Sequence, residues 1–213
     1  TSVPKLDAAA ATSLRGGRVV VNTEWGGFAD DSLPTLDADR ELDAATPHAG
    51  EQLMEKQMSG MYLGEVARRL LVSLASSGVL FSGRVPKRLA EPGCVTTAHV
   101  ARCDGDRSLA LAATAAVLAD ALGATTTSYL DRRLVRRVCH LVALRSARLF
   151  ATAVAALLRQ IGRDASADPP VAAAVDGGVF EHYALYRGYA TAALVELLGR
   201  SAASPLSSSF SLP

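Results

Sequence analysis

The sequence predicts an α/β fold that is rich in helix. Two short apolar segments, residues 18–24 and 171–175, have the β-branched or continuously apolar composition of strands. Four longer segments repeat apolar side chains at the spacing of one helix face: residues 51–76, 108–122, 130–161 and 181–198. Fully helical packing is the alternative architecture, and it is favoured if the two strand candidates do not pair.

The first strand candidate follows a Gly16-Gly17 turn signal and ends at Glu24. Residues 29–50 are dense in Asp, Pro and Gly, which predicts a surface connection with one helical turn around residues 38–42. In the segment 51–76 the apolar face changes where Gly60 and Gly64 occur. Because glycine is a usual site for a helix to bend or restart, we expect two helices there.

Residues 77–107 carry scattered Gly, Pro and charges and predict a loop with short turns. The helix at 108–122 is expected to stop at Gly123. For the arginines at positions 132, 133, 136, 137, 145 and 148 of the helix at 130–161, we expect solvated faces and salt bridges rather than an anion site. Its inward side chains are predicted to be Leu134, Val138, Leu141, Leu149 and Ala156.

The second strand candidate runs through Asp176-Gly177-Gly178 into the helix at 181–198, whose inward side is expected to carry Tyr183 and Tyr186. Such a strand, glycine turn and helix can present backbone N–H groups to an anion, although many α/β units use glycine there only to turn. Residues 200–213 are rich in serine, and we expect this tail to be disordered. The domain prediction is one unit over 1–199 followed by that tail.

Composition excludes several classes of function. Lys and Arg number 22 against 21 Asp and Glu, without a basic block, so nucleic acid is not an expected partner. Three cysteines without CxxC spacing indicate reduced intracellular thiols rather than a disulfide frame or a zinc site, and the four histidines lack the spacing of metal ligands. No uninterrupted apolar stretch reaches the length that a bilayer requires, so no transmembrane segment is expected.

Two segments place carboxylates in apolar, glycine-punctuated surroundings: Asn22-Thr23-Glu24-Trp25-Gly26, and Gly50 to Lys56 running into Ser59-Gly60-Met61. Both carboxylates are predicted beside the core, where a charge is costly unless a ligand satisfies it. Sugar hydroxyls would do so, because ionised carboxylates accept charge-assisted hydrogen bonds. A helix cap or a salt bridge is the structural alternative for either glutamate.

These segments, with Leu42-Asp43, Leu80-Phe81, Val175 to Tyr183 and Glu196 to Gly199, resemble the large domain of a hexokinase over roughly residues 5–199. The sequence around Gly177, together with Ser32-Leu33-Pro34 and Ile161 to Asp164, is most similar to that of plant and green-algal hexokinases. The resemblance implies a helix-rich, incomplete half of an actin-like, ribonuclease-H-like ATPase fold. It also implies an enzyme that uses ATP with Mg²⁺ to phosphorylate glucose or a related hexose at the 6-hydroxyl.

By resemblance, Glu24 and Glu55 match the two large-domain carboxylates that hold the hexose hydroxyls. On the nucleotide side, Gly60 and Met61 match a step at the start of a helix, and Thr97 matches a threonine beside ATP. Gly177 and Gly178 match a turn that serves either phosphate approach or plain turn geometry. Ala101 departs from the serine of many relatives, so one hydroxyl contact is lost.

The resemblance places the catalytic aspartate and the glycine-rich phosphate loops outside this sequence, so we expect no catalytic residue in the chain and no activity from the chain alone. Thr1 is not Met, and we expect the true start to be missing; the cytoplasm is the expected compartment. A non-catalytic sugar-binding sensor or scaffold is the alternative function, and a partial or mispredicted gene product is a third reading. The sequence carries no signal for an oligomeric state.

Overall fold

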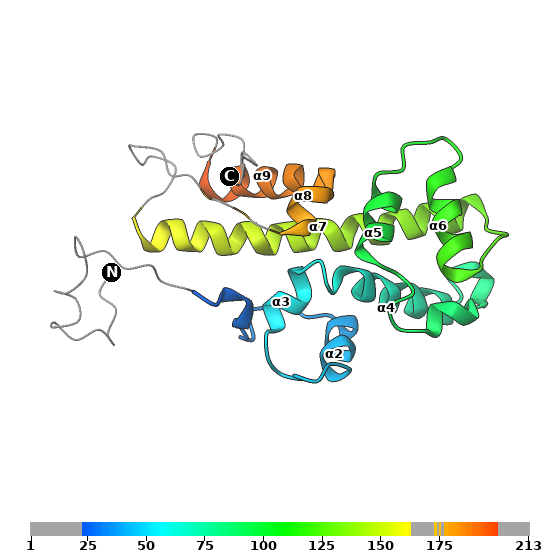
Figure 1. The fold of residues 1–213 in the computed structure, drawn as a ribbon, viewed down its shortest axis with the longest axis horizontal. Coiled ribbons are helices and arrows are strands. Elements are labelled where there is room, and N and C mark those ends of the chain that lie inside the picture. The colour runs from blue at the N-terminus through cyan, green and yellow to red at the C-terminus, as the bar shows by residue number, and fades with distance from the viewer. Residues whose placement is uncertain (1–22, 163–172, 174, 176, 200–213) are drawn as a thin grey trace, which may run out of the picture.

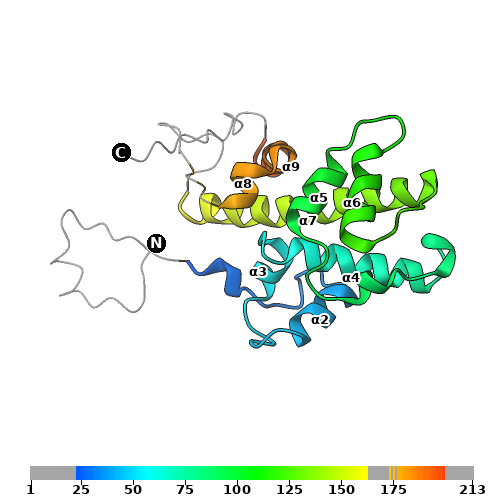
Figure 2. The ribbon, with the colours of Figure 1, turned by 45° about the vertical axis from the view of Figure 1, so that its right-hand side comes forward.

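A single long helix organises the molecule. The computed structural model describes residues 23–162, 173, 175 and 177–199. Helix α7 runs through its centre, with α8 and α9 on one side and α2, α3 and α4 on the other (Figures 1 and 2). Helices α5 and α6 lie toward the N-terminal end of α7. The bounds are η2 Trp25–Gly27, α2 Asp37–Ala44, α3 Leu53–Met58, α4 Leu63–Ser76, η3 Phe81–Gly83, η4 Lys87–Ala90, α5 Thr97–Asp104, α6 Ala112–Leu122, α7 Tyr129–Gln160, α8 Gly178–His182 and α9 Ala184–Leu198.

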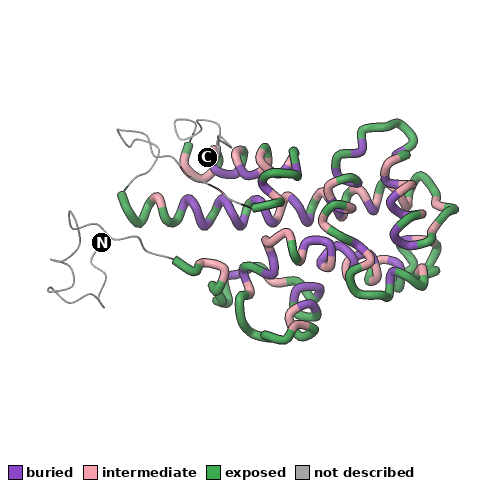
Figure 3. The backbone as a smooth tube through the Cα atoms, viewed as in Figure 1, coloured by how far each residue is buried: buried purple, intermediate pink, exposed green. Residues whose placement is uncertain are grey.

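The core follows the middle of α7, where buried residues dominate (Figure 3). Alanines recur there at every fourth position, on one face of the helix, and all of them are buried. Small side chains let neighbouring helices approach α7 closely, and α9 packs along it with its own buried Ala190 and Ala193. The α7 alanines are Ala143, Ala147, Ala151 and Ala155.

The predicted inward side of α7 is wrong in part. Leu149 is buried and Leu134 and Val138 are half-buried, but Leu141 and Ala156 are exposed. Along much of the helix the buried face is displaced by one residue from the predicted one, so that Val135 and Cys139 are buried while Leu134 and Val138 are only half-buried. Because helices pack on α7 from several sides, a single stripe chosen by hydrophobic size misses the alanines that form the contact. The buried positions include Val135, Cys139, Val142, Ala143, Ser146 and Ala147.

The expectation of no transmembrane segment rested on the lack of an uninterrupted apolar stretch, and helix α7 bears on it through the looser test of length and overall composition. By length and composition alone it passes that test, and it is the only helix among the described residues to do so. In the fold, 56% of its apolar window is buried against other parts of the chain. Packing by α9, α5 and α4 makes α7 the core helix of this assembly of helices.

Several sequence predictions of helix ends are confirmed. Helix α3 ends at Met58 and α4 begins at Leu63, so the predicted break at Gly60 is present. Helix α6 stops at Gly123, whose backbone adopts the left-handed conformation with φ of 67°. The predicted turn around 38–42 is the full helix α2.

Two other predictions need correction. The segment 77–107 contains a helix, α5, whose start is capped by the Thr96 hydroxyl accepting from the His99 N–H. The helix predicted at 181–198 is two helices, because the backbone leaves the helical conformation at Tyr183 (φ −97°, ψ 86°). Tyr183 and Tyr186 are both buried, as predicted.

All the elements formed by the described residues are helical. Most of the two strand candidates, 18–24 and 171–175, falls outside the described residues, and their described members Thr23, Glu24, Ala173 and Val175 are not in strands. The serine-rich tail at 200–213 likewise lies outside the described part.

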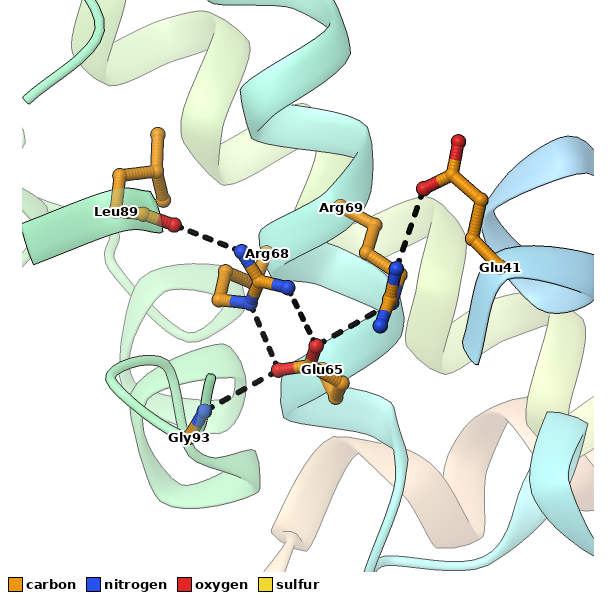
Figure 4. Close-up of polar contacts among 6 residues, drawn as sticks. All are labelled: Glu41, Glu65, Arg68, Arg69, Leu89 and Gly93. Atoms are coloured by element: carbon orange, nitrogen blue, oxygen red, sulfur yellow. Dashed lines mark hydrogen bonds and ion pairs between the residues drawn. The ribbon is translucent and has the colours of Figure 1, made fainter. Parts of the chain in front are cut away.

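A buried ion network joins α4 to its surroundings (Figure 4). Arg68 makes two bonds to Glu65, of 2.8 and 2.6 Å, and a third to the Leu89 carbonyl at 2.8 Å. Glu65 also accepts from the Gly93 N–H, and Arg69 bridges Glu65 and Glu41, each at 3.2 Å. Burial opposes ionisation of Glu65, but these bonds outweigh it and lower its pKa. The network fixes α4 against α2 and the loop before α5.

A second buried carboxylate fixes the start of α6. Asp106 accepts from the N–H and hydroxyl of Thr114, at 2.8 and 2.9 Å, and from those of Ser108, at 3.0 and 2.7 Å. Burial raises its pKa, but the four hydrogen bonds outweigh burial and lower the pKa to about 2.

Asp106→Asn is expected to lower the free energy of unfolding by about 2 kcal/mol at pH 7, since an amide cannot accept all four bonds and the pKa shift corresponds to that energy. The folded pKa lies below the unfolded value, so this stability is present above pH 4 and is lost as pH falls toward 2. Urea unfolding of both proteins between pH 7 and pH 2 measures the gap. Asp31→Asn, at an exposed position, is the control; a gap that stays constant down to pH 2 would contradict the assignment.

Gly64→Ala and Gly188→Ala are expected to have opposite effects. A Cβ on Gly64 would lie 2.3 Å from the Val95 carbonyl oxygen, and backbone cannot move aside cheaply, so we expect a loss of about 1–3 kcal/mol. A Cβ on Gly188, in α9, meets nothing within 4 Å, so alanine there should add up to about 1 kcal/mol. Thermal and urea unfolding measure both; equal effects would show that the close approach at Gly64 does not exist.

Candidate functional site

A cavity of about 780 Å³ lies beside the middle of α7, a volume within the usual range for small-molecule sites. Its walls come from η2, the turn between α3 and α4, the first turns of α5, the middle of α7, and the segment from Val175 through α8 into α9. The lining residues are Trp25, Met58, Ser59, Gly60, Met61, Thr97, Ala98, Ala101, Phe150, Val175, Gly177, Gly178, Val179, Phe180, His182, Tyr183 and Tyr186.

Five aromatic rings form one continuous wall of the cavity. Trp25 packs edge-on against Phe150 with ring centroids 5.9 Å apart, and the ring centroids of Phe150 and Phe180 are 5.8 Å apart. Phe180 packs edge-on against Tyr186 at 6.5 Å, and Tyr186 lies 6.2 Å from Tyr183. Tilted and edge-on contacts at these distances are favourable. The wall therefore links η2, near the N-terminal end of the described residues, to α9 near the C-terminal end.

The tyrosine hydroxyls of this wall are held by buried groups. The Ser146 hydroxyl on α7 donates to the Met58 carbonyl at 2.8 Å and lies 2.9 Å from the Tyr186 hydroxyl, which donates to it. Burial raises the pKa of Tyr186 to about 12, with the Ser146 contact opposing that rise. Ser146 thus joins the turn after α3 to α9 across α7.

The structure brings together all five residues predicted for the nucleotide side. Gly60, Met61, Thr97, Gly177 and Gly178 line the same cavity, although they come from three segments of the chain. The Thr97 hydroxyl donates to the Gly60 carbonyl, which fixes α5 against the turn before α4. Met61 is 79% exposed and lies at the cavity rim. Ala101 also lines the cavity, so its methyl group stands where a serine hydroxyl was expected.

The segments that carry the two predicted sugar carboxylates pack against each other, next to the cavity. Glu24 precedes η2 in a left-handed conformation (φ 46°), and Glu55 is in the first turn of α3. A Cβ on Gly26 would lie 3.1 Å from the Glu55 Cβ and 3.5 Å from its Oε2, so α3 passes directly against η2. Trp25 follows Glu24 and lines the cavity, so the carboxylates and the cavity meet at η2.

The expectation that both carboxylates lie beside the core is wrong, because Glu24 and Glu55 are exposed. Helix α3 turns its neighbours Met54, Lys56 and Gln57 inward instead. The buried charge is Lys56, whose ammonium donates to Asp43 at 2.6 Å and to the His48 carbonyl at 2.7 Å.

Sequence analysis missed a buried polar cluster behind the cavity. Asp104, at the end of α5, accepts from the hydroxyls of Tyr183 and Tyr189, each at 2.8 Å, and lies 3.1 Å from His140 Nδ1. These partners lie 36, 79 and 85 positions along the chain, so no local pattern could have found them. The nearest related feature of the sequence is Thr96, which caps the start of α5, the helix that ends at Asp104.

The structure also describes potential metal ligands, the cysteines and the arginines of α7. No three His, Cys, Asp or Glu side chains of the described residues could together hold a metal ion. Cys94, Cys103 and Cys139 are free thiols. Of the arginines of α7 that were assigned to solvent and salt bridges, Arg148 pairs with Glu196 at an exposed position, whereas Arg145 makes two bonds of 2.8 and 2.6 Å to the buried Asp39 of α2.

Comparison with known proteins identifies relatives along the whole chain. A protein-family model described as Hexokinase matches residues 1–211. Hexokinase-2 of Oryza sativa subsp. japonica is 39% identical over 90% of this chain and 39% of its own length, and Hexokinase-1 of Arabidopsis thaliana is 37% identical over 95% of this chain and 41% of its own. The chain thus spans about two-fifths of the length of these relatives.

A solved structure has the same fold. The hexokinase from Schistosoma mansoni complexed with glucose superposes with a TM-score of 0.75 at 32% identity, over 83% of this chain and 39% of that chain. With the helical architecture described above, this similarity confirms the predicted fold class, a helix-rich, incomplete half of the actin-like α/β fold.

Ser146→Ala is expected to lower the free energy of unfolding by about 1–3 kcal/mol, because the Met58 carbonyl and the Tyr186 hydroxyl both lose a buried partner. Urea unfolding followed by Trp25 fluorescence measures the loss. Ser73→Ala, on the exposed side of α4, is the matched control and should be neutral or slightly stabilising. Equal effects at the two serines would refute the role of Ser146 as a tie across α7.

Proposed function

Because the chain belongs to the hexokinase family, we propose that it forms the hexose-holding wall and part of the nucleotide wall of an ATP-dependent hexokinase. The complete enzyme would transfer the γ-phosphoryl group of MgATP to the 6-hydroxyl of glucose or a related hexose. Such a reaction depends on positioning and on electrostatic stabilisation of the phosphates in a closed site. An intracellular, cytoplasmic location belongs to the same proposal.

The observation that carries the sugar assignment is the close packing of η2, which Glu24 precedes, on α3, which carries Glu55. Ionised carboxylates only accept hydrogen bonds, and a hexose offers several hydroxyl donors around one ring. Gly26 lets α3 pack closely on η2, since a Cβ there would lie 3.0 Å from Gln52 Oε1 and 3.1 Å from the Glu55 Cβ. The relative from Schistosoma mansoni, solved with glucose, supports hexose as the ligand class.

The cavity supports the nucleotide assignment. Its aromatic and apolar wall suits a flat base. The backbone of Gly177 and Gly178 lets phosphates approach, because a Cβ on Gly177 would meet nothing within 4 Å and one on Gly178 only His182 Cδ2 at 3.8 Å. Because no group of three metal-ligating side chains occurs among the described residues, Mg²⁺ would be held chiefly by phosphate oxygens and water, as this ion prefers.

We propose that the chain alone binds these ligands without catalysing transfer. A base is needed to take the proton from the attacking hydroxyl, and no Asp or Glu is among the described residues that line the cavity. Glu24 and Glu55 act as acceptors that orient the sugar. A glucose-dependent formation of ADP by the purified 213-residue chain would overturn this part of the proposal.

A non-catalytic sugar sensor or scaffold is the second candidate. The observation that favours it is that both glutamates are present on segments that pack against each other, Glu24 just before η2 and Glu55 in α3. Measured glucose binding without ADP formation fits both candidates. A cellular partner that binds the chain only when glucose is present would favour the sensor.

Isothermal titration calorimetry of the chain with glucose tests the hexose assignment. We expect a Kd in the millimolar range or tighter, and roughly a two- to tenfold loss in Glu24→Gln and in Glu55→Gln, because a hydrogen bond to an exposed group contributes only about 0.5–1.5 kcal/mol net.

Glu51→Gln is the matched control, since Glu51 is an exposed glutamate that precedes α3. It should leave the affinity unchanged. No heat with glucose in the wild-type chain, or an equal loss in all three variants, would remove the sugar assignment.

A further inference from the structure

Asp104 occupies an unusual position for a carboxylate. It is the last residue of α5 and only 1% exposed, and the described side chains that bond to it are two tyrosines and a histidine. Burying a carboxylate is costly unless hydrogen bonds satisfy its oxygens. The Tyr183 and Tyr189 hydroxyls supply two bonds of 2.8 Å to Oδ2, and His140 Nδ1 lies 3.1 Å from Oδ1.

These partners join elements on opposite sides of the cavity. Helix α5 contributes Thr97, Ala98 and Ala101 to one wall, and Asp104 lies one turn beyond Ala101 on the same helix. Tyr183 belongs to the facing wall, where α8 gives way to α9. Since α5 packs chiefly on α7, α4 and α6, the bond from Tyr183 to Asp104 is a direct tie from α5 to the α8–α9 wall.

The tie acts at the junction of α8 and α9, where the Tyr183 N–H still donates to the Val179 carbonyl at 3.0 Å. Tyr183 separates two helices and has the non-helical angles φ −97° and ψ 86°. Its ring continues the aromatic wall toward Tyr186, while its hydroxyl is bonded away from the cavity to Asp104. The direction of that ring, and with it the end of the wall, therefore depends on Asp104.

The electrostatics keep this hydroxyl a donor. Burial, and then the charge of Asp104 and the hydrogen bond to it, raise the pKa of Tyr183 far above its ordinary value. For Tyr189 the same causes raise the pKa to about 12. Both hydroxyls are thus protonated at any physiological pH.

We propose that Asp104 is a positioning residue for the cavity: through the Tyr183 hydroxyl it fixes the α8–α9 wall against α5 and so sets the shape of the pocket that takes the nucleotide. The last clause rests on the function proposed above. Asp104 itself does not line the cavity and touches no ligand in this scheme.

The chain provides a matched set of variants. Asp104→Asn weakens the acceptor, and Tyr183→Phe removes the donor while keeping the ring in the wall. Tyr189→Phe removes an equal bond to the same carboxylate, but Tyr189 is not among the cavity residues. Val117→Ala, in the buried face of α6 and away from the cavity, controls for a general loss of stability. Trp25 is the sole tryptophan and lines the cavity, so its fluorescence reports ligand binding directly.

Titration of each variant with MgATP is the first measurement. We expect Asp104→Asn and Tyr183→Phe each to weaken binding roughly three- to thirtyfold, the range for residues that act on a site through others. The double variant should be no weaker than Asp104→Asn alone, because that change already disturbs the bond from Tyr183. Tyr189→Phe and Val117→Ala should change the affinity less than twofold. Equal losses in Tyr183→Phe and Tyr189→Phe, or additive losses in the double variant, would overturn the proposal.

Acrylamide quenching of Trp25 in the unliganded chain is the second measurement, and it does not depend on a nucleotide. Asp104→Asn and Tyr183→Phe should increase quenching by loosening the wall, and Tyr189→Phe should not. If the wild-type chain does not bind MgATP, the nucleotide assignment fails, and the quenching result alone decides the role of Asp104. Unchanged quenching in both variants would reject that role.

Discussion

Close packing against α7 is the constraint on which the rest of the structure depends. Helices reach it from both sides, and the alanines at positions 143, 147, 151 and 155 let them come close enough for side chains of separate layers to meet. Ser146 lies among these alanines and is fully buried, so its hydroxyl can bond to both layers. A larger side chain at these positions would push the layers apart and open the cavity wall.

The cavity combines a broad apolar wall with a few buried hydrogen bonds, or ties, that join separate elements. Dispersion and burial of the five rings supply most of the cohesion, but such contacts are not directional. Direction comes from the hydrogen bonds of Thr97, Ser146 and Asp104, each of which joins two elements. Each contributes only about 1 kcal/mol net, whereas leaving one buried partner unpaired costs about 1–3 kcal/mol. The ties therefore select one arrangement of the wall more than they stabilise the fold.

The sequence predicted what depends on local patterns. Periodicity located α4, α6 and α7, glycines located the break before α4, and motif resemblance named the five residues that the cavity brings together. It failed where long-range packing decides: Leu141 looked like a core residue and is exposed, and Asp104 looked unremarkable and is buried. Helix α5 was missed because its cap uses Thr96 with His99 in place of the more familiar glutamate at the third position.

The same difference explains the error about Glu24 and Glu55. Their apolar neighbours suggested burial, but helix α3 is short and presents Glu55 to solvent while Lys56 turns inward. A hydrogen bond between a sugar hydroxyl and an exposed carboxylate replaces one to water, so its net gain is small. It becomes strong only where water is excluded and the local dielectric falls. Under the proposed function, the two carboxylates would therefore orient a hexose on this chain, whereas tight binding and phosphoryl transfer would require a second wall that closes over the sugar.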